Sequence, residues 1–361
     1  MNPDSKQVFV SGIDHPFFRI PSLINTFEDT LLAFAEARKS LFDQAENKIV
    51  LKRSEDNGET WSACQTIVES SSGSLNNPCC VIDRTSGRII LIFQMYPRGV
   101  SEFRNIKPTD IKDFIIYSDN DGKSWSSMRE ITQSTKYPDS LTIASGPGVG
   151  IQLKNNKYKN RIVIPYNHRI GFKWWVYCCY SDDGGQNWKK GTPAKNDGYF
   201  SGGNEVQIVE LSDGTLMLNC RPWGLRNRFN TYRRIAFSKD GGHSWSQLQK
   251  ELQLSDSQCQ GSIIRYMKNG DESGNYILFS NPATKKGRHS GALYASNDEG
   301  KMWPFRKIIE SEYFAYSCLA NLPDGNIGIL YETGKNKLYE SINFLKIRVD
   351  EIHAFFSTNK I

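Results

Sequence analysis

The sequence predicts an all-β protein, a single six-bladed β-propeller whose hairpin turns are Asp boxes, and three observations predict it. The segment Ser-x-Asp-x-Gly-x-x-Trp, or a close variant, occurs five times, beginning at Ser54, Ser118, Ser181, Ser238 and Ser296. Successive copies begin 57 to 64 residues apart, and a repeated unit of this length is typical of repeat architectures. The chain of 361 residues holds six such units, which fits six four-stranded sheets around one axis.

Each Asp box is interpreted as a clamped turn between two strands. The third position is Asp in four copies and Asn120 in the second. Either side chain accepts hydrogen bonds from backbone N–H groups a few residues further on. The Gly can adopt a positive φ where the chain reverses, and the Trp buries a large ring against the same unit. We therefore expect the boxes to be folding devices rather than catalytic groups.

A run of β-branched and aromatic residues precedes each box, which is typical of a strand. These runs are residues 49–54, 114–118, 175–181, 234–238 and 292–296. Five boxes leave one of the six blades unmarked. We expect that blade near the C-terminus, completed by a strand from the N-terminus. No low-complexity linker and no change of composition divides the chain, so residues 1–361 are predicted to form one domain.

Charge and hydropathy exclude several classes of protein. The 45 Lys and Arg residues exceed the 39 Asp and Glu residues by six and form no block of like charge, so nucleic acid binding is not indicated. A mild positive field favours the capture of an anionic substrate. No apolar run approaches the ~20 residues of a transmembrane helix. The N-terminal segment also lacks the pattern of a signal peptide.

The eight cysteines are expected to be small buried residues rather than disulfide partners. They include two adjacent pairs, and none has the Cys-x-x-Cys spacing of a metal site. Neighbouring residues of a strand point to opposite faces. The sequence also contains no Asn-x-Ser/Thr glycosylation site. These features favour a cytoplasmic protein, although a secreted protein without its signal segment would share them. We expect a monomer that needs no metal and no cofactor.

Charged residues interrupt the apolar strand patterns near the N-terminus. Arg19 lies within the run FFRIPSLI, where a charge is costly unless it meets a partner or an anionic ligand. The alternative is an arginine at a strand edge that reaches solvent. Glu36 and Arg38 share one face of the next predicted strand, and Asp43 follows on a polar loop. These three residues either contact a ligand or form a solvated charged loop.

Further polar residues lie at the ends of the following predicted strands. Asn77 precedes an apolar strand, and Glu102 follows the next one. Tyr166 and His168 lie at the end of the run IVIPYNHRIG. Tyr, Asn and His side chains can hydrogen-bond a polyol. The alternative for all four residues is a surface position without a functional role.

Two predicted hairpins of equal length bring polar residues to one end of their blades. Glu205 and Arg221 lie 16 residues apart on either side of an Asp-Gly turn, and so do Tyr316 and Glu332. Arg288 lies just before the strand that leads to the fifth box. Blade ends near the axis meet at the central channel of a propeller. We therefore expect these residues to lie at one site.

With these residues identified, the chain resembles the exo-sialidases (neuraminidases) that fold as six-bladed propellers with Asp boxes. The resemblance covers nearly the whole chain and rests on several motifs in one order. They are the Asp boxes, Arg-Ile-Pro at 19–21, an acidic residue ahead of Val-Glu-Leu-Ser-Asp-Gly at 209–214, and Tyr-Ser ahead of Leu-Tyr-Glu at 330–332. The segments AFAEAR, NNPCC and VSEF are similar to the animal cytosolic sialidases. The hairpin from Glu205 to Arg221 is more similar to the bacterial ones.

The resemblance implies a binding role for most of the candidate residues. Arg19, Arg221 and Arg288 match the three arginines that bind the sialic acid carboxylate, since a guanidinium holds a carboxylate through two parallel hydrogen bonds. Glu332 matches the residue that orients Arg19. The family often has Tyr where this chain has His168. The positions implied to line the rest of the sugar pocket and its glycerol tail are Glu36, Arg38, Asn77, Glu102, Tyr166 and His168.

The resemblance also implies a retaining exo-α-sialidase that acts on sialylated glycoproteins, gangliosides or oligosaccharides. Tyr316 matches the nucleophile, Glu205 its base, and Asp43 the general acid and base. A phenol suits this reaction because an attacking carboxylate would be repelled by the carboxylate on the sugar's anomeric carbon, and sialidases are the known tyrosine exception among glycosidases. One alternative is a trans-sialidase. The other is a sialic acid-binding propeller without catalysis, which would need the arginines but not the Tyr316–Glu205 pair.

Overall fold

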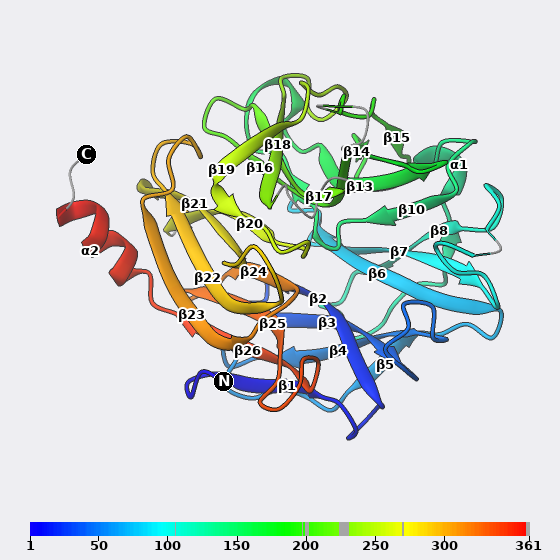
Figure 1. Ribbon diagram of the computed structural model, residues 1–361, viewed down its shortest axis with the longest axis horizontal. Coiled ribbons are helices and arrows are strands. Elements are labelled where there is room, and N and C mark those ends of the chain that lie inside the picture. Colours follow the sequence, from blue (N-terminus) through cyan, green and yellow to red (C-terminus); the bar gives the residue numbers. More distant parts are fainter. Residues whose placement is uncertain (105, 197, 199–201, 224–230, 269–270, 359–361) are drawn as a thin grey trace.

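The computed structural model confirms the all-β fold and the six blades around a central axis, seen face-on in Figure 1. It describes residues 1–104, 106–196, 198, 202–223, 231–268 and 271–358. Within these ranges the strands form six sheets of four or five strands each. The sheets follow one another around the ring in the order of the sequence.

Each of the first three blades begins with its innermost strand and runs outwards. Blade 1 contains β2 (Phe17–Asn25), β3 (Leu31–Arg38), β4 (Lys48–Ser54) and β5 (Gln65–Val68). Blade 2 contains β6 (Gly73–Ile82), β7 (Ile89–Pro97), β8 (Lys112–Ser118) and β9 (Arg129–Glu130), with β11 (Gly148–Val149) parallel to β6. Blade 3 contains β10 (Thr142–Ser145), β13 (Ile162–Ile170), β14 (Lys173–Ser181) and β15 (Lys189–Lys190), with β12 (Ile151–Gln152) beside β13.

The other three blades have four strands each. Blade 4 contains β16 (Gly202–Glu210), β17 (Leu216–Trp223), β18 (Tyr232–Ser238) and β19 (Gln249–Ser255). Blade 5 contains β20 (Ser262–Lys268), β21 (Asp271–Pro282), β22 (His289–Ser296) and β23 (Phe305–Tyr313). Blade 6 contains β24 (Ser317–Asn321), β25 (Ile327–Thr333), β26 (Ser341–Ile347) and β1 (Lys6–Val10). The short helix α1 (Thr132–Thr135) lies between blades 2 and 3, and the short helix η1 (Asn156–Tyr158) lies within blade 3.

Blade 6 closes the ring with strands from both ends of the sequence. The outermost strand β1 pairs antiparallel with β26, from Lys6 opposite Phe344 to Val10 opposite Ser341. The side chain of Phe9 is fully buried against blade 1. Because this is the blade without an Asp box, the prediction that it lies near the C-terminus and is completed from the N-terminus is confirmed.

The five Asp boxes lie between the third and fourth strands of blades 1 to 5 and form the predicted turns. In the third box the hydroxyl of Ser181 donates to Oδ1 of Asp183 at 2.8 Å. The same oxygen accepts the backbone N–H of Asn187 at 2.9 Å. The N–H of Gly185 donates to Ser181 Oγ at 2.9 Å, and Gly185 has a φ of 84°. The box is thus a closed hydrogen-bonded loop that belongs to its own blade.

The core is a ring of apolar clusters, each lying between two neighbouring blades. Alternate residues of an inner strand face opposite neighbours, so these strands are apolar on both sides. Cys79 faces blade 3 and Cys80 faces blade 1, although they are adjacent in β6. Cys178 and Cys179 divide between two clusters in the same way. All eight cysteines are free thiols; seven are buried and Cys64 is half-buried.

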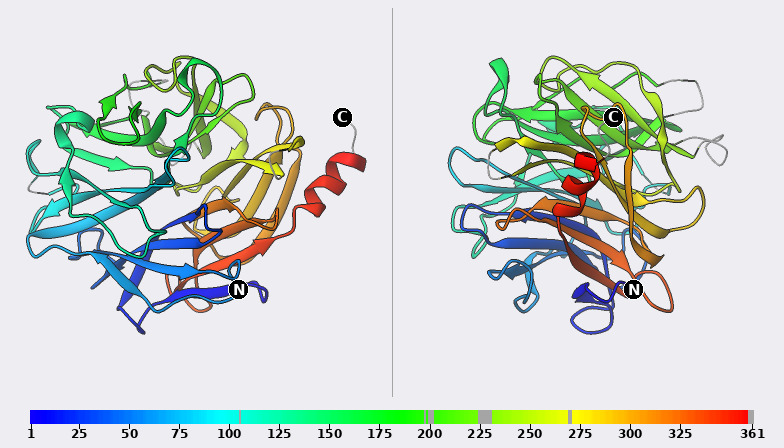
Figure 2. Two further views of the ribbon diagram at one scale, coloured as in Figure 1. Left: turned by 180° about the vertical axis from the view of Figure 1, so that it is seen from behind. Right: turned by 90° about the vertical axis from the view of Figure 1, so that its left-hand side faces the viewer.

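Helix α2 (Asp350–Thr358) lies outside the ring of blades, as Figure 2 shows from behind and from the side. Its Phe355 packs edge-on against Phe305 with ring centroids 5.4 Å apart, and Phe356 stacks on Tyr276 at 5.1 Å. The helix therefore covers the outer part of blade 5. No helix among the described residues is both long and apolar enough to cross a membrane.

Candidate active site

Three inner strands are bulged where they border the central channel. The register of β2, β6 and β16 shifts once against the neighbouring strand. A residue at each shift has a positive φ, which is 60° at Ile20, 56° at Asn77 and 25° at Glu205. Such φ values are uncommon for residues other than Gly. Bulges are over-represented beside active sites because they turn a side chain out of the strand's regular alternation.

Arg19 is buried in the channel wall and paired with Glu332 from blade 6. Its Nε donates to Oε1 of Glu332 at 2.7 Å, and the same oxygen accepts the backbone N–H of Ile20 at 2.8 Å. The other oxygen of Glu332 accepts the backbone N–H of Tyr316 at 3.2 Å. Burial acts to lower the pKa of Arg19, but the Glu332 carboxylate outweighs burial and raises it. Arg19 is therefore a charged group with a buried partner, not a solvent-exposed arginine at a strand edge.

Tyr316, just before β24, directs its phenol at Glu205 in blade 4. The hydroxyl of Tyr316 donates to Oε1 of Glu205. Nη1 of Arg221 donates to Oε2 of Glu205 at 2.8 Å and lies 3.4 Å from the Tyr316 oxygen. The Cζ atoms of Arg19 and Arg288 lie 5.1 and 5.2 Å from the centroid of the Tyr316 ring. The phenol of Tyr316 thus lies against one carboxylate that accepts its hydrogen bond and beside three guanidiniums.

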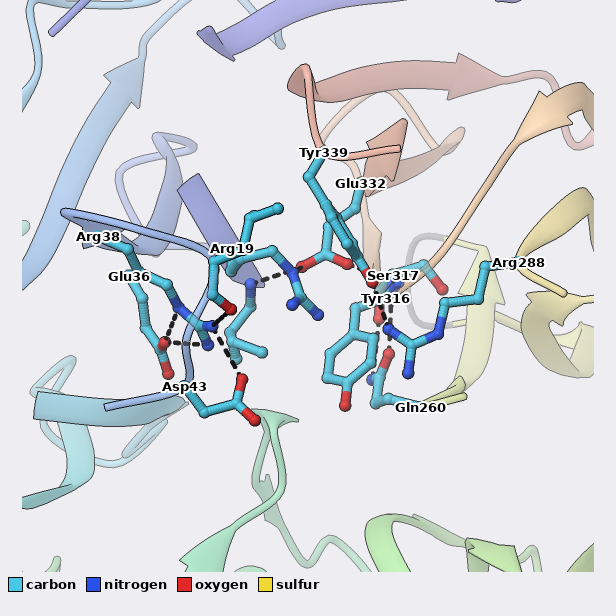
Figure 3. Close-up of polar contacts among 12 residues, drawn as sticks. Arg19, Glu36, Arg38, Asp43, Gln260, Arg288, Tyr316, Ser317, Glu332 and Tyr339 are labelled. Atoms are coloured by element: carbon cyan, nitrogen blue, oxygen red, sulfur yellow. Dashed lines mark hydrogen bonds and ion pairs between the residues drawn. The ribbon is translucent and has the colours of Figure 1, made fainter. Parts of the chain in front are cut away.

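Arg288 lies just before β22 and completes a group of three arginines from blades 1, 4 and 5, of which Figure 3 shows Arg19 and Arg288 on either side of Tyr316. Its Nη1 donates to the hydroxyl of Tyr339 at 2.5 Å, and its Nη2 donates to the carbonyl of Gln258 at 3.3 Å. Together with Arg19 and Arg221 it surrounds the phenol of Tyr316. The predicted arginines thus lie at one site although they are far apart in the sequence.

Asp43 lies on the loop after β3 and is held by Arg38. Nη1 of Arg38 donates to Oδ1 of Asp43 at 2.9 Å, and the Asp43 side chain is 62% exposed. Burial acts to raise the pKa of Asp43, but attraction from Arg38, Arg19 and Arg288 outweighs burial and lowers it. Asp43 is therefore an exposed carboxylate whose charge is stabilised by three guanidiniums.

Glu36 lies behind Arg38, and its predicted contact with the sugar is corrected. Its side chain is fully buried, and its Oε2 accepts from Nε of Arg38 at 2.7 Å. Its Oε1 accepts the backbone N–H of Asn77 at 2.6 Å. Since both oxygens have internal partners, Glu36 supports Arg38 and the bulge at Asn77 instead of facing a ligand.

Glu102 lies on the loop after β7, within the electrostatic field of the site. Burial, with repulsion from Asp43 and Glu205, raises the pKa of Glu102 to about 7. The loop is fixed where Arg169 donates to the backbone carbonyl of Glu102 at 2.5 Å. Glu102 therefore lies within the electrostatic influence of Asp43 and Glu205. Asn77 contributes its backbone, whose N–H donates to Glu36.

Tyr166 and His168 do not reach the channel, and their predicted contact with a glycerol tail is corrected. The strand β13 continues to Ile170, so both side chains point into the interface between blades 2 and 3. Tyr166 is fully buried and donates to Oδ2 of Asp113 at 2.7 Å. Nδ1 of His168 lies 2.6 Å from the hydroxyl of Ser140, and burial lowers the pKa of His168 to about 4. Both side chains are thus buried inside the molecule, away from the arginines of the site.

Tyr339 is part of the site but was not predicted. It lies on the loop between β25 and β26, and its ring packs against Arg19, with 3.9 Å from Cζ to the ring centroid. The only signal in the sequence is the apolar pair Leu338-Tyr339 within the polar loop GKNKLYES. An apolar pair in a short polar loop indicates a side chain that turns back into the molecule, but it does not say where.

The site consists of arginines, carboxylates and phenols. Among the residues that the structure describes, no group of three or more His, Cys, Asp or Glu side chains could hold a metal ion. The residues gathered here are suited to binding an anion and transferring protons.

The fold and the site define a propeller built from Asp-box repeats with an arginine-lined channel. The family model described as "BNR repeat-like domain" matches residues 29–329, so the chain belongs to this family. The sialidase of Micromonospora viridifaciens is 31% identical over 346 residues, which are 91% of this chain and 52% of that protein. Sialidase-2 of Mus musculus is 27% identical over 362 residues, covering 91% of both chains. The resemblance to bacterial and animal sialidases is thus confirmed.

A solved structure supports the same relationship. The Hadza microbial sialidase Hz136 superimposes with a TM-score of 0.84 at 25% identity, over 96% of this chain and 69% of that chain. The chain spans about half the length of the Micromonospora relative that it matches.

Proposed function

We propose that this protein is a retaining exo-α-sialidase that hydrolyses terminal α-linked sialic acids from glycoconjugates. The observation that carries the proposal is the phenol of Tyr316 bound to Glu205 and surrounded by three arginines. Three guanidiniums fit a sugar that bears a carboxylate. A phenol with a carboxylate base fits a nucleophile that must approach this anionic sugar. A protein that only binds sialic acid has no need of that pair.

The proposed reaction has two steps, and each is a substitution at the anomeric carbon of the sugar. Arg19, Arg221 and Arg288 bind the sugar carboxylate. The oxygen of Tyr316 then forms a bond to the anomeric carbon while its proton passes to Glu205. The bond to the leaving oxygen breaks, and Asp43 supplies that oxygen with a proton. Asp43 next takes a proton from water, whose oxygen displaces Tyr316 while the proton on Glu205 returns to the Tyr316 oxygen. Two inversions leave the configuration retained.

Asp43 must gain a proton before it can act as the acid in this scheme. The pKa of Asp43 is lowered because the attraction of Arg38, Arg19 and Arg288 outweighs burial. A bound carboxylate neutralises Arg19 and Arg288 and weakens their effect on Asp43. Substrate binding therefore raises the pKa of Asp43 and prepares the acid.

The proposed substrates are glycoproteins, gangliosides and sialylated oligosaccharides. The net charge of +6 supports capture of anionic substrates. We also propose a monomer in the cytoplasm, because eight free thiols fit a reducing compartment. Transfer of the sugar to a second sugar differs only in the acceptor at the second step.

The test is the Tyr316→Phe variant, assayed on a fluorogenic sialoside. We expect its kcat to fall by about a hundredfold or more, because the nucleophilic oxygen is lost. Binding of a non-cleavable sialoside should remain within a few-fold of the original. Tyr313→Phe is the matched control, since Tyr313 lies at the end of β23 and is 37% exposed. Full activity of Tyr316→Phe contradicts the mechanism.

Analysis of the products separates the alternatives. Proton NMR of the first-formed sugar should show the α-anomer, which demonstrates retention. Added lactose should leave the yield of free sialic acid unchanged in a hydrolase and divert it to sialyllactose in a trans-sialidase. Binding without any release of sugar indicates a lectin.

A further inference from the structure

Tyr339 lies between two arginines that the proposed function assigns to the substrate carboxylate. Cζ of Arg19 stands 3.9 Å above the centroid of the Tyr339 ring. Nη1 of Arg288 donates to the hydroxyl of Tyr339 at 2.5 Å. Figure 3 shows the tyrosine reaching into the site between the two guanidiniums. One side chain therefore touches two cations, with its ring face and with its oxygen.

The loop that carries Tyr339 is built to hold it in one place. Tyr339 has a φ of 72°, which is uncommon for a bulky residue and is retained only where the surroundings impose it. The hydroxyl of Ser11 donates to the carbonyl of Tyr339 at 2.9 Å, and the N–H of Ser11 donates to that of Glu340 at 2.9 Å. Oε2 of Glu340 accepts the N–H of Lys335 at 2.7 Å and closes the loop. These bonds fix the direction of the ring.

The two guanidiniums need such a partner because they repel each other. The negative face of an aromatic ring attracts a cation, most strongly when the cation is desolvated, and Arg19 is only 6% exposed. The Tyr339 hydroxyl offers Arg288 an acceptor without adding a charge that would compete with an incoming carboxylate. Nε of Arg19 is occupied by Glu332 and one face by the ring. This leaves the edge formed by the two Nη atoms for a ligand.

We infer that Tyr339 is a positioning residue: its ring fixes the plane of Arg19 and its hydroxyl fixes Arg288, so that both guanidiniums meet one carboxylate. The inference rests on the proposed function for the identity of that ligand, a sugar acid. Tyr339 acts through the arginines and takes no part in bond making.

The test compares Tyr339→Leu, which loses both contacts, with Tyr339→Phe, which loses only the hydroxyl. The probe is the glycal of sialic acid, which keeps the carboxylate but cannot be cleaved, and its Kd is measured by calorimetry. We expect the Kd to rise about tenfold for Tyr339→Leu and about threefold for Tyr339→Phe. On a fluorogenic sialoside KM should rise by a similar factor, while kcat changes less.

Tyr117→Leu is the matched control. Arg88 lies over the ring of Tyr117 at 4.1 Å, so the control removes the same kind of contact on the outer part of blade 2. Its Kd should stay within about twofold of the original. The inference is overturned if Tyr339→Leu also stays within about twofold, or if Tyr117→Leu weakens binding as much.

Labelling with phenylglyoxal tests the geometry independently of any sugar. In Tyr339→Leu the face of Arg19 is uncovered, so mass spectrometry of peptides should show faster modification at Arg19 than in the original protein. Tyr117→Leu should leave the rate at Arg19 unchanged. If the original protein does not bind the glycal, the proposed function is wrong. The labelling rates at Arg19 would still show whether the Tyr339 ring covers that guanidinium. Equal rates at Arg19 in both proteins overturn the inference.

Discussion

At the scale of single residues, the site is governed by which charges surround each carboxylate. Asp43 and Glu102 lie near each other, yet their pKa values shift in opposite directions. Burial raises the pKa of Glu102 to about 7, whereas three arginines overcome burial at Asp43 and lower its pKa. The two pKa values differ because burial and the repulsion from Asp43 and Glu205 outweigh Arg169 and Arg221 at Glu102, whereas the arginines outweigh burial at Asp43.

The pH dependence of turnover should reveal this control of Asp43. The profile of kcat/KM reports the pKa of the free enzyme and that of kcat reports the bound complex. Because a bound carboxylate weakens the pull of Arg19 and Arg288, we expect the descending limb for the acid to lie at higher pH in kcat than in kcat/KM. Rate measurements from pH 3 to 8 check this. Coincident limbs in the two profiles would contradict the proposed link.

The charged residues of the site could be predicted from the sequence, but the positions of some uncharged residues could not. Arg19 was predicted because a charge in an apolar strand needs a partner, and Glu205 because a hairpin brings it to the same blade end as Arg221. Tyr166 and His168 were misplaced because the sequence does not show where β13 ends, and a strand that continues to Ile170 turns both side chains into the blade interface. Tyr339 was missed because its position depends on the bonds that close its loop.

At the scale of the elements, the turn of an Asp box forms with either Asp or Asn at its third position. In the second box Oδ1 of Asn120 accepts from the hydroxyl of Ser118 and the N–H of Ser124, both at 3.0 Å. Asp183 makes the same two contacts in the third box at 2.8 and 2.9 Å. The shared requirement is one fixed acceptor oxygen, not a charge. The repeated boxes made the number of blades predictable, whereas nothing in the sequence marked the bulges.

Substitutions at Asp183 should separate the oxygen from the charge. We expect Asp183→Asn to change the free energy of unfolding by less than about 0.5 kcal/mol, since Asn120 shows that the amide suffices. Asp183→Ala removes the acceptor and should cost about 1–3 kcal/mol. Urea unfolding measures both, and kcat/KM of the folded enzyme should be unchanged. Equal losses for the two variants would show that the charge matters.

The interface between blades 2 and 3 contains a carboxyl group that couples stability to pH. Asp113 is fully buried and accepts from Tyr166 and from Gln94, each at 2.7 Å. Burial raises the pKa of Asp113 from 3.8 to about 6. The folded protein thus binds this proton more tightly than the unfolded chain. The stabilisation is complete below about pH 4 and is lost as the pH rises through about 6.

Asp113→Asn should remove this dependence. Relative to that variant, the original protein should lose on the order of 3 kcal/mol of unfolding free energy between about pH 4 and pH 7. The comparison uses urea unfolding of both proteins across this range, since other groups titrate equally in both. A constant difference between the two proteins would contradict the raised pKa.

At the scale of the whole molecule, the last blade is completed by a strand from the N-terminal end of the sequence. β1 adds the outer edge to blade 6 through its pairing with β26, and Val8 and Phe9 are buried in doing so. Without β1 the hydrogen-bonding edge of β26 would be open, and exposed edges of this kind pair with other chains. The closing strand lies far along the sequence from its partner, yet the missing sixth box made its place predictable.

Removal of residues 1–10 should therefore weaken the whole protein rather than one blade. We expect a Tm lower by several degrees or more, together with concentration-dependent association detected by light scattering. A synthetic peptide of residues 1–12, added in excess, should restore the monomer. Lys6→Gln is the control, because Lys6 makes only an exposed ion pair with Glu59. A truncated chain with unchanged Tm would show that β1 is dispensable.

The pairing of β1 with β26 also sets an order in time. On a ribosome that adds about 5–20 residues per second, β1 waits roughly 20 to 70 seconds for its partner to be made. Until then the apolar faces of the first and last blades have no neighbours. Arg19 and Asp43 are synthesised early, and Tyr316 and Glu332 late, so the channel is assembled only when the ring shuts. The site is therefore a property of the closed ring, since no single blade carries all of its residues.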